Sequence, residues 1–557
     1  MRLLVKYRFL IYLAAVIPLF ILRDFTPDNE LRYLSIADEA IRNGNLFTFT
    51  NHGIPYADKP PLYLWIVMAG KLLFGHHSMF FLALFSYLPA IITIYVMDKW
   101  ISKYVNRQAL IAGELMLLTS VYFMGAGVVA RMDMLMCMFI TLSLYVFYRM
   151  YMGDGKKFDG LLFPLLVFMA IFSKGPIGIL VPFVSTVTFL LLRKDYKAIG
   201  RFWGIKTLSV LLVLCLVWFG MVWAEGGKEY LNNLLFNQTV NRAVNSFHHK
   251  EPFYYYFISI LYSLFPWSIL VIAMMVTGIS KRAKINEGYS STLEKFFMVV
   301  ALSTFGLLSL ISSKLQIYLL PAFPFFIYLT LLWLPKFGAT GFGPSRFVKI
   351  SLEIPAYLLA LITPAYFIYV MSSNRPETYT VTPPASILIP TALTIVSTAG
   401  ILSLYILHSN KMQIYRVIST LSAGILLSVF VASFAVPQLN PFIGMGTLCK
   451  EAKEVAEKEG ISNFVYYRLK QADNLDVYLG TQLQELSLEE LKNIVDKRIS
   501  EEKEDPSRQI GRRSILFVKQ SHMLGKDKEA ATLLEKYEKH PVGKYFYIIL
   551  SLVSKEK

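Results

Sequence analysis

The chain has 557 residues, of which 55% are hydrophobic and 15% aromatic, while only 17% are charged. A composition this apolar excludes a single soluble domain and predicts a membrane protein. The formal net charge of +17 does not indicate a nucleic acid partner, because Lys and Arg occur in short groups between apolar runs rather than on one basic face. The three cysteines, Cys137, Cys215 and Cys449, form neither a disulfide framework nor a metal-binding spacing.

The first apolar run, residues 8–23, ends in Arg23 and Asp24 rather than in a small-residue cleavage site, so we interpret it as a retained membrane span. A spanning helix needs about 20 predominantly apolar residues. Runs near that length predict about thirteen spans, at residues 8–23, 78–98, 109–129, 134–151, 159–173, 176–193, 207–224, 254–279, 296–312, 317–334, 350–371, 385–407 and 414–436. The predicted fold is therefore an all-α polytopic membrane protein.

Basic residues fall in alternate connections between these runs, which predicts a cytoplasmic N-terminus. The apolar run 62–74 has only 13 residues and follows Pro60 and Pro61, so we expect an interfacial helix rather than a span. An odd number of spans then places the C-terminus on the outer side of the membrane.

The composition changes after Val436 to charged, alternating segments. Helix-like stretches at 447–458 and 486–502 and strand-like stretches at 463–467 and 514–518 predict a soluble α/β domain. The predicted domains are residues 1–436, with outer loops at 24–77, 128–134 and 225–253, and residues 437–557.

Six polar connections share the outer side of this predicted topology. They are PDNELRY (27–33), YADKPP (56–61), ARMDM (130–134), SKGP (173–176), FNQTVNRAVNSFHHKEPFYYY (236–256) and SSKLQIYLLP (312–321). Singly, their charged residues have plainer explanations as helix caps (Asp28 or Glu30, Asp133), a surface ion pair (Asp58 with Lys59) or snorkelling side chains (Lys174, Lys314). Together, on one face of a membrane, they predict a functional site.

A cationic cluster of Lys59 and Arg242, with Lys174 and Lys314 as further candidates, could hold a phosphate and stabilise the charge of a phosphate leaving group. Asp28 could accept a proton from an incoming hydroxyl or orient an acceptor phosphate. Asp133 could support the same centre or hold a divalent cation. Apolar helices beside the cluster would accommodate lipid tails, so the implied substrate is a phosphorylated lipid.

At these residues the sequence resembles the GT-C fold glycosyltransferases that use polyprenyl-phosphate sugars, in particular the group with bacterial aminoarabinose transferase and dolichyl-phosphate-mannose protein mannosyltransferases. That family carries, in order, an acid-Glu-x-Arg-Tyr motif, Tyr-Phe-Glu-Lys-Pro-Pro, Arg-x-Asp-Met, Thr-Lys-Gly-Pro and Ser-Lys-x3-Tyr-x-Leu-Pro. PDNELRY, YADKPP, ARMDM, SKGP and SSKLQIYLLP resemble these motifs in the same order. The resemblance covers roughly residues 23–324 by motif and the whole chain by architecture.

The resemblance implies that Asp28 and Asp133 are essential acids, that Lys59 binds the donor phosphate, and that Arg242 and Tyr318 also contact it. The supporting residues of the site would be Asp58, Arg32, Tyr33, Tyr56, Arg131, Gln238 and His249.

Three departures from the family pattern leave alternatives open. PDNELRY has one residue more between its acid and its Arg, so Glu30 could act in place of Asp28. Asp58 stands where the family has Glu and is the candidate ligand for a divalent metal ion. The family's His, another metal-contact candidate, corresponds to Gln238, so a metal contact is not expected there.

The function implied is transfer of a sugar with inversion, best matched by 4-amino-4-deoxy-L-arabinose, from undecaprenyl phosphate to lipid A or another envelope acceptor. The site would face the periplasm of a bacterial inner membrane. A protein O-mannosyltransferase-like enzyme and a transporter or flippase for lipid-linked sugars are the alternatives. A transporter would be expected to place ionisable residues near the bilayer midplane and on both faces, whereas the predicted spans carry few, with Glu114 and Glu353 as exceptions.

Overall fold

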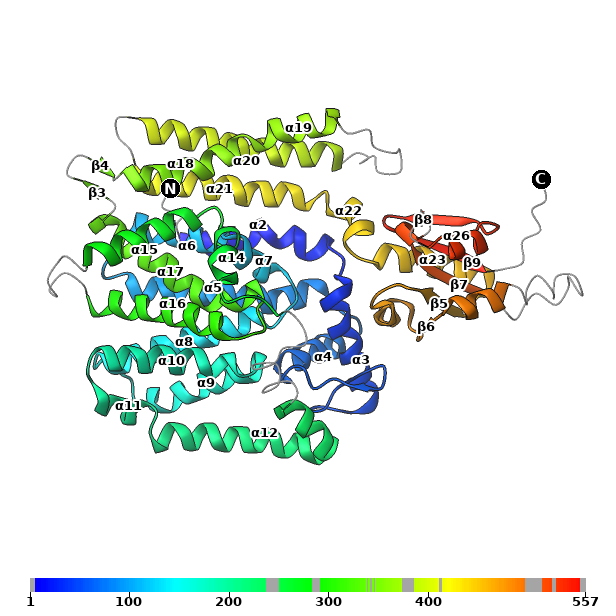
Figure 1. The fold of residues 1–557 in the computed structure, drawn as a ribbon, viewed down its shortest axis with the longest axis horizontal. Helices are drawn as coiled ribbons and strands as arrows, with labels where there is room; N and C mark the ends of the chain where they lie inside the picture. Colours follow the sequence, from blue (N-terminus) through cyan, green and yellow to red (C-terminus); the bar gives the residue numbers. More distant parts are fainter. Residues whose placement is uncertain are drawn as a thin grey trace, which may run out of the picture.

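The structure, a computed structural model, describes residues 6–236, 250–282, 291–337, 339–340, 343–344, 346–372, 385–409, 413–495, 513–522 and 527–550. Figure 1 shows a bundle of helices with a small sheet domain at one end, whereas the N-terminus lies toward the other end. We call the sheet domain and its helices, after α22 (Val436–Ile443), the tail domain.

The helices of the bundle are α2 (Arg8–Leu22), α3 (Arg32–Asn43), α4 (Leu62–Phe74), α5 (Met79–Ile101), α6 (Arg107–Thr119), α7 (Val121–Val128), α8 (Asp133–Tyr151), α9 (Asp159–Lys174), α10 (Ile177–Leu192), α11 (Tyr196–Phe202), α12 (Ile205–Asn232), α14 (Tyr255–Ser263), α15 (Ser268–Arg282), α16 (Thr292–Leu310), α17 (Phe323–Phe337), α18 (Arg346–Ala360), α19 (Ile362–Ser372), α20 (Ala385–His408) and α21 (Ile414–Ser433). Short turns of other helix types are η1 (Pro27–Leu31) and η4 (Gln316–Ala322), and short hairpins are β1 (Thr50–Asn51) with β2 (Ile54–Pro55) and β3 (Ala339–Thr340) with β4 (Gly343–Pro344).

The tail domain contains α23 (Gly446–Glu459), η6 (Ala472–Leu475), α24 (Asp476–Leu479), α26 (Lys528–Leu533) and the strands β5 (Asn463–Tyr467), β6 (Gln484–Glu485), β7 (Ser514–Lys519), β8 (Lys539–Val542) and β9 (Tyr545–Leu550). The strand order is β6-β5-β7-β9-β8. β5 pairs in parallel with β6 and β7, whereas β9 pairs antiparallel with β7 and β8. The α/β tail predicted from the sequence is therefore confirmed.

The membrane bundle confirms the predicted fold class but not the predicted number of full-length spans. In the described part of the chain, eight helical segments are long and apolar enough to cross a membrane, or up to ten when two bent pairs each count as one. Each of the thirteen predicted runs contains helix, but α9 and α10 have only 16 residues each, and the run 254–279 is divided between α14 and α15. The run 62–74 forms α4, whose 13 residues are too few to span, as predicted.

Local sequence signals explain where several of these helices begin and end. The Asn106 side chain accepts a hydrogen bond from the Ala109 backbone N–H at 2.9 Å and so caps the start of α6. Helix α4 ends at Gly75, whose φ of 73° lies in the left-handed region that a side chain disfavours. The helix is therefore short because Pro61 precedes it and Gly75 follows it.

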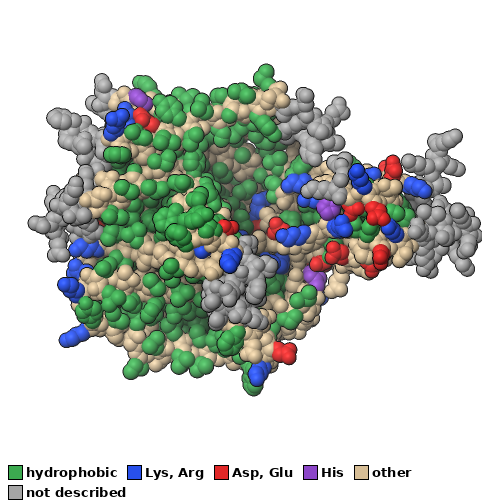
Figure 2. Space-filling view, viewed as in Figure 1, with side chains coloured by type: hydrophobic (Ala, Val, Ile, Leu, Met, Phe, Trp, Pro, Cys, Tyr) green, Lys and Arg blue, Asp and Glu red, His purple; other side chains and the backbone are tan. Residues whose placement is uncertain are grey.

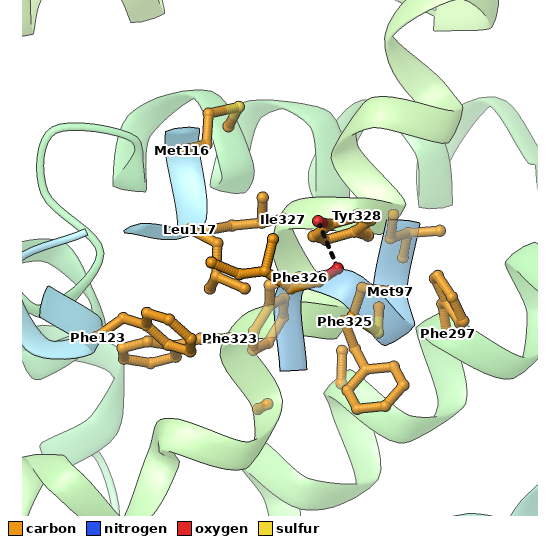
Figure 3. Packing of buried hydrophobic residues seen from close by; sticks show 14 of the residues in the cluster. Met97, Met116, Leu117, Phe123, Phe297, Phe323, Phe325, Phe326, Ile327 and Tyr328 are labelled. Carbon is orange, nitrogen blue, oxygen red and sulfur yellow. Dashed lines mark hydrogen bonds between the residues drawn. The ribbon is translucent and has the colours of Figure 1, made fainter. Parts of the chain in front are cut away.

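Helix α17 forms the centre of the bundle. The apolar window within Gln316–Lys336 is 89% buried, whereas the window within Tyr196–Phe236, which contains α12, is only 22% buried. Figure 3 shows Phe323 and Phe326 of α17 among side chains from neighbouring helices, including Met97 of α5 and Leu117 of α6. Because η4 directly precedes α17, this packing fixes the segment that carries Tyr318.

Several ionisable side chains inside the predicted spans form one paired cluster. Arg8 Nε donates hydrogen bonds at 2.8 Å to both carboxylate oxygens of Glu114. Tyr328 donates its hydroxyl proton to Asp98 at 2.7 Å, and Arg8 also lies 3.5 Å from Asp98. This cluster joins α2, α5, α6 and α17, and pairing of this kind offsets part of the cost of burying charge.

The tail domain docks on the first outer loop of the bundle. His52 Nε2 and Ser35 Oγ lie 3.3 Å and 3.2 Å from the same oxygen of Asp476 in α24. Asn440 of α22 donates a hydrogen bond to the Leu22 carbonyl at 2.8 Å. Figure 2 shows the difference in surface: hydrophobic side chains cover much of the bundle, whereas charged side chains gather on the tail domain and the adjoining end.

The His52–Asp476 contact predicts a pH-dependent attachment of the tail domain. The hydrogen bond to the Asp476 carboxylate raises the pKa of His52 above its ordinary value, and Asp473 and Glu39 add to this shift. A raised folded-state pKa stabilises the folded state fully below the unfolded pKa of about 6.5, and this stabilisation is lost as pH rises through the folded value. Hydrogen exchange of the 50–55 hairpin should therefore be faster at high pH after correction for the intrinsic rate.

The matched control is His52→Gln, which keeps a polar side chain but cannot be protonated. This variant should show no corrected pH dependence in the hairpin. The same dependence in both proteins would show that the contact is not responsible.

Candidate functional site

Asp133 is the buried centre of the candidate site. It begins α8 and is 0% exposed. Lys174, at the end of α9, donates a hydrogen bond to Asp133 Oδ1, and Arg131 Nε lies 3.0 Å from Oδ2. The Lys174 ammonium group also lies 4.4 Å from the centre of the Tyr318 ring in η4. Three of the six predicted loops therefore converge, and two cations surround one carboxylate.

Lys59 lies beside this centre on the loop that leads into α4. Its ammonium nitrogen is 3.1 Å from Asp58 Oδ2, and both side chains are 16% exposed. Lys59 is close enough to interact electrostatically with Asp133 and Lys174. The YADKPP loop thus adds another cation to the cluster on its more accessible side.

Arg32 and Tyr56 form the next layer around Asp58. The Tyr56 hydroxyl donates a hydrogen bond to Asp58 Oδ2 at 3.4 Å, and the Arg32 guanidinium lies 5.7 Å from the centre of the Tyr56 ring. Burial raises the pKa of Tyr56 well above its ordinary value, so the phenol stays protonated and remains a donor. Arg32 also lies 6.0 Å from the ring of the buried Tyr33, so the predicted supporting residues of the first two motifs do come together.

Glu30 is fully engaged in holding the backbone. Its two carboxylate oxygens each accept a hydrogen bond from Arg23 at 2.7 Å. They also accept bonds from the backbone and hydroxyl of Thr26, and from the Ala130 backbone N–H at 2.7 Å. Glu30 therefore ties the first outer loop to the segment before Asp133, which is a structural task that leaves little capacity for proton transfer.

Asp28 lies in η1, next to Gln471 of the tail domain. Its side chain is exposed and forms no ion pair with any described residue. With the Gln471 amide in its hydrogen-bonded orientation, the Gln471 nitrogen donates to the Asp28 carbonyl at 2.8 Å. The structure therefore does not bring Asp28 into contact with the Lys59 and Asp133 cluster, and its role as the essential acid stays a prediction.

Lys314 joins two other predicted loops. Its buried ammonium group donates a hydrogen bond to the Glu251 carbonyl at 2.9 Å, next to the bridge between Lys250 and Ser313. This contact makes Lys314 a link between the loop segments at 250–256 and 312–321. The predicted residues Arg242, Gln238 and His249 lie outside the described residues.

A metal site at Asp58 has no further support in the described part of the chain. No group of three or more His, Cys, Asp or Glu side chains there is arranged to hold a metal ion. The described partners of Asp58, Lys59 and Tyr56, are both donors rather than metal ligands. Within the described residues, the donor set around Asp58 therefore gives no metal site to assign.

Sequence reasoning missed a second support for the Lys59 loop, which comes from the peripheral helix α12. Glu225 accepts hydrogen bonds from the backbone N–H groups of Leu46, Phe47 and Thr48, the last at 2.8 Å, and from the Thr48 hydroxyl at 2.7 Å. Further along α12, the Tyr230 hydroxyl donates to the Tyr56 carbonyl at 2.8 Å.

The available signal for this contact was the sequence Glu225-Gly226-Gly227 at the end of an apolar run. A Cβ on Gly226 would lie 2.5 Å from the Thr48 side chain, so the close approach of α12 to the loop requires glycine. Gly227 has a φ of 70° and allows the helix to change direction there. We call Glu225 and Tyr230 together the α12 clamp.

Replacing Glu30 by Ala should destabilise the whole bundle. The substitution leaves the Arg23 side chain, only 9% exposed, as an uncompensated buried charge. Breaking a buried pair in this way typically costs about 3–5 kcal/mol. Thermal unfolding in detergent should show a clear decrease in melting temperature, whereas Asp28→Ala should change it little because Asp28 is exposed. Equal melting temperatures for Glu30→Ala and the wild type would contradict this role.

Replacing Glu225 by Ala should release the loop at 46–48 without unfolding the bundle, because α12 is peripheral. The three backbone N–H groups lose their acceptor and should exchange hydrogen faster. Hydrogen exchange measured by mass spectrometry checks this. Glu229→Ala, at another exposed acid on α12, is the matched control and should leave residues 46–48 protected.

Several known proteins are similar to this chain in sequence. The dolichyl-phosphate-mannose-protein mannosyltransferase family matches residues 58–223, which include Lys59, Asp133 and Lys174. An uncharacterized protein of Aquifex aeolicus is 27% identical over 300 residues, 53% of this chain and 57% of that protein. The undecaprenyl phosphate-alpha-4-amino-4-deoxy-L-arabinose arabinosyl transferase of Edwardsiella ictaluri is 26% identical over 304 residues, 53% of each chain. The chain thus spans about half the length of the curated relatives it matches.

The likeness in fold extends over the whole chain. The crystal structure of ArnT from Cupriavidus metallidurans bound to undecaprenyl phosphate superposes with a TM-score of 0.72 at 16% sequence identity and covers 99% of both chains. The resemblance drawn from the loop motifs is confirmed by these matches. The chain has the GT-C fold and is related to the group that contains the aminoarabinose transferases and the protein mannosyltransferases.

Proposed function

We propose that this chain is an integral membrane glycosyltransferase that transfers a sugar from an undecaprenyl-phosphate donor to an acceptor at the outer membrane face. The observation that carries the proposal is the buried Asp133 carboxylate with Lys174 and Arg131 around it and Lys59 beside it. Three cations and two carboxylates, Asp133 and Asp58, leave a net positive site next to an apolar bundle. Such a site suits a lipid-linked phosphate.

Within this site, Asp133 orients cations rather than accepting a proton. It is fully buried and already paired with Lys174 and Arg131. A unit positive charge about 4 Å from a phosphate charge contributes roughly 4 kcal/mol at an effective dielectric constant near 20. Lys59, paired only with the half-buried Asp58 among described residues, is the cation best placed to meet the phosphate.

The transfer itself is a single displacement. The acceptor oxygen forms a bond to the anomeric carbon as the bond from that carbon to the phosphate oxygen breaks, and the phosphate leaves with the bonding electron pair. Without a covalent sugar–enzyme intermediate, the configuration at the anomeric carbon inverts. An acceptor hydroxyl would pass its proton to a carboxylate, for which Asp58 beside Lys59 and Asp28 at the loop tip are the candidates, whereas an acceptor phosphate needs no base.

The finer assignment follows the names of the relatives. We propose 4-amino-4-deoxy-L-arabinose as the donor sugar and lipid A or another envelope lipid as the acceptor, because several relatives are named as arabinosyl transferases for that undecaprenyl-phosphate donor. The family match to protein mannosyltransferases favours a hexose and a protein acceptor as the second candidate. The proposed location is a bacterial inner membrane, with the N-terminus cytoplasmic and the tail domain periplasmic.

A flippase for lipid-linked sugars is the alternative from another class. The observation in its favour is the second buried ionic cluster, Arg8 with Asp98 and Glu114, which involves different helices from the candidate site. The three side chains of that cluster pair with one another and with Tyr328, however, so we assign the cluster to helix packing.

The test is transfer of labelled sugar from an undecaprenyl-phosphate donor to extracted envelope lipids by the purified protein. We expect Lys59→Ala to lower kcat/KM about 100- to 1000-fold, as for removal of one charge-stabilising group. Asp133→Asn should lower kcat/KM by a similar factor, because Lys174 and Arg131 then lose the carboxylate that positions them. Lys228→Ala removes an exposed charge on α12 and should retain full activity.

Three further outcomes are informative. Asp58→Asn and Asp28→Asn compared side by side show which carboxylate serves a hydroxyl acceptor. Donor moved across a vesicle bilayer with no new glycolipid would support the flippase and contradict the enzyme. Full activity in a folded Lys59→Ala protein would remove the proposed phosphate site.

A further inference from the structure

A polar cleft lies where the tail domain meets the first outer loop. It has a volume of 480 Å³ and is lined by residues of α3, α4 and the segment containing α24. The residues that matter for the argument are Asp38, Arg42, Lys71, Asp476, Thr481 and Gln482. Ligand pockets are typically roughly 300–1,000 Å³, so the cleft is large enough for a small saccharide.

The cleft contains a buried acceptor without a donor. The Asp476 side chain is 8% exposed, and its Oδ2 atom is paired with His52 and Ser35. Its Oδ1 atom is buried and has no hydrogen-bond partner. The Asp476 carboxylate therefore forms part of the cleft wall and has one oxygen to which no described residue donates.

The opposite side of the cleft carries cations. Lys71 Nζ lies 3.6 Å from Asp38, whose Oδ1 atom is also 2.9 Å from His77. Arg42 is exposed in the last turn of α3 and forms no ion pair with any described residue. A basic side chain is stabilised in the last turn of a helix, which explains why Arg42 and Lys71 occur where they do. It does not explain why both line the same cleft. The lining thus has two carboxylates, Asp38 and Asp476, and two cations, and Arg42 is the cation without an ion pair to a described residue.

This combination is complementary to one chemical class. A sugar hydroxyl both donates and accepts, so it pairs with a carboxylate on one side and with Thr481, Gln482 or a cation on the other. A phosphate or carboxylate on the sugar would pair with the Arg42 guanidinium.

Both helices of the cleft begin at the candidate active site. Arg32, which contacts Tyr56, starts α3, and ten residues later Arg42 lies about 15 Å away at 1.5 Å per residue. Helix α4 begins three residues after Lys59 and reaches Lys71 over a similar distance, about 14 Å. A ligand held in the cleft therefore lies about 15 Å from the candidate active site, a distance that a short oligosaccharide can span.

We propose that this cleft binds the saccharide headgroup of the acceptor, and specifically a headgroup with an anionic substituent such as phosphate. The inference rests on the proposed function, because it identifies the cleft as the acceptor subsite of that transfer. It also gives the tail domain a role, since α24 supplies one wall.

The first test measures binding without catalysis. Calorimetry with purified full-length protein and a soluble phosphorylated glucosamine disaccharide should detect binding to the wild type. Arg42→Gln removes the free cation and Thr481→Tyr fills the cleft, and each should weaken binding at least about tenfold, which is 1.4 kcal/mol. Lys453→Gln, an exposed cation on α23, is the matched control and should bind as the wild type does. No binding to the wild type, or equal binding to all four proteins, would overturn the proposal.

The second test separates this subsite from the reaction. In the transfer assay, Arg42→Gln and Thr481→Tyr should raise the acceptor KM about tenfold and leave kcat and the donor KM unchanged. Transfer by the wild type with an unchanged acceptor KM in both variants would overturn the cleft while leaving the enzyme intact. A wild type that binds the disaccharide but transfers no sugar would contradict the proposed function and not the binding site. Matching melting temperatures would show that the variants are folded.

Discussion

The burial of the Asp133 carboxylate is the constraint on which the outer face of this protein depends. A lone carboxylate in such a place would cost several kcal/mol, so the fold must bring cations to it. Lys174 arrives from the end of α9 and Arg131 from the turn before α8, while the Tyr318 ring packs against the Lys174 ammonium group. Three connections far apart in sequence are thereby held together, and the same charges form the positive cluster that we propose as the phosphate site.

Around that centre, the supporting interactions are carboxylates that bind backbone. Glu30 binds the segment before Asp133, and Glu225 binds the loop before Lys59. Neither carboxylate faces the cluster, yet each sets the position of a residue that does. The site therefore uses acids in two ways, as partners for buried cations and as acceptors for loop N–H groups.

Much of the fold could be predicted from the sequence because its signals are local. The boundaries of α4 follow from prolines and a glycine, and the strand-like stretch 463–467 is an apolar run that forms β5, so both predictions agree with the structure. The meeting of Asp133 with Lys174 and Tyr318 followed from topology and from family motifs. The number of full-length spans could not be predicted from the sequence, because hydropathy alone cannot distinguish a 16-residue helix from a longer one. The contact between Glu225 and the loop at 46–48 could not be predicted either, because its partners lie 177 to 179 residues earlier in the chain and leave no local pattern.

The docking of the tail domain has a consequence for how the protein is made. Ser35 and His52 leave the ribosome long before their partner Asp476, which is 441 residues after Ser35. The Asp24 backbone N–H likewise donates to the Asn440 side chain, which is synthesised 416 residues later. The first outer loop must therefore stay incompletely held while the later helices are inserted, and it closes only when the tail domain has folded against it. Such late, long-range closure makes assembly slow, and it ensures that only a chain synthesised through its tail presents a finished outer face.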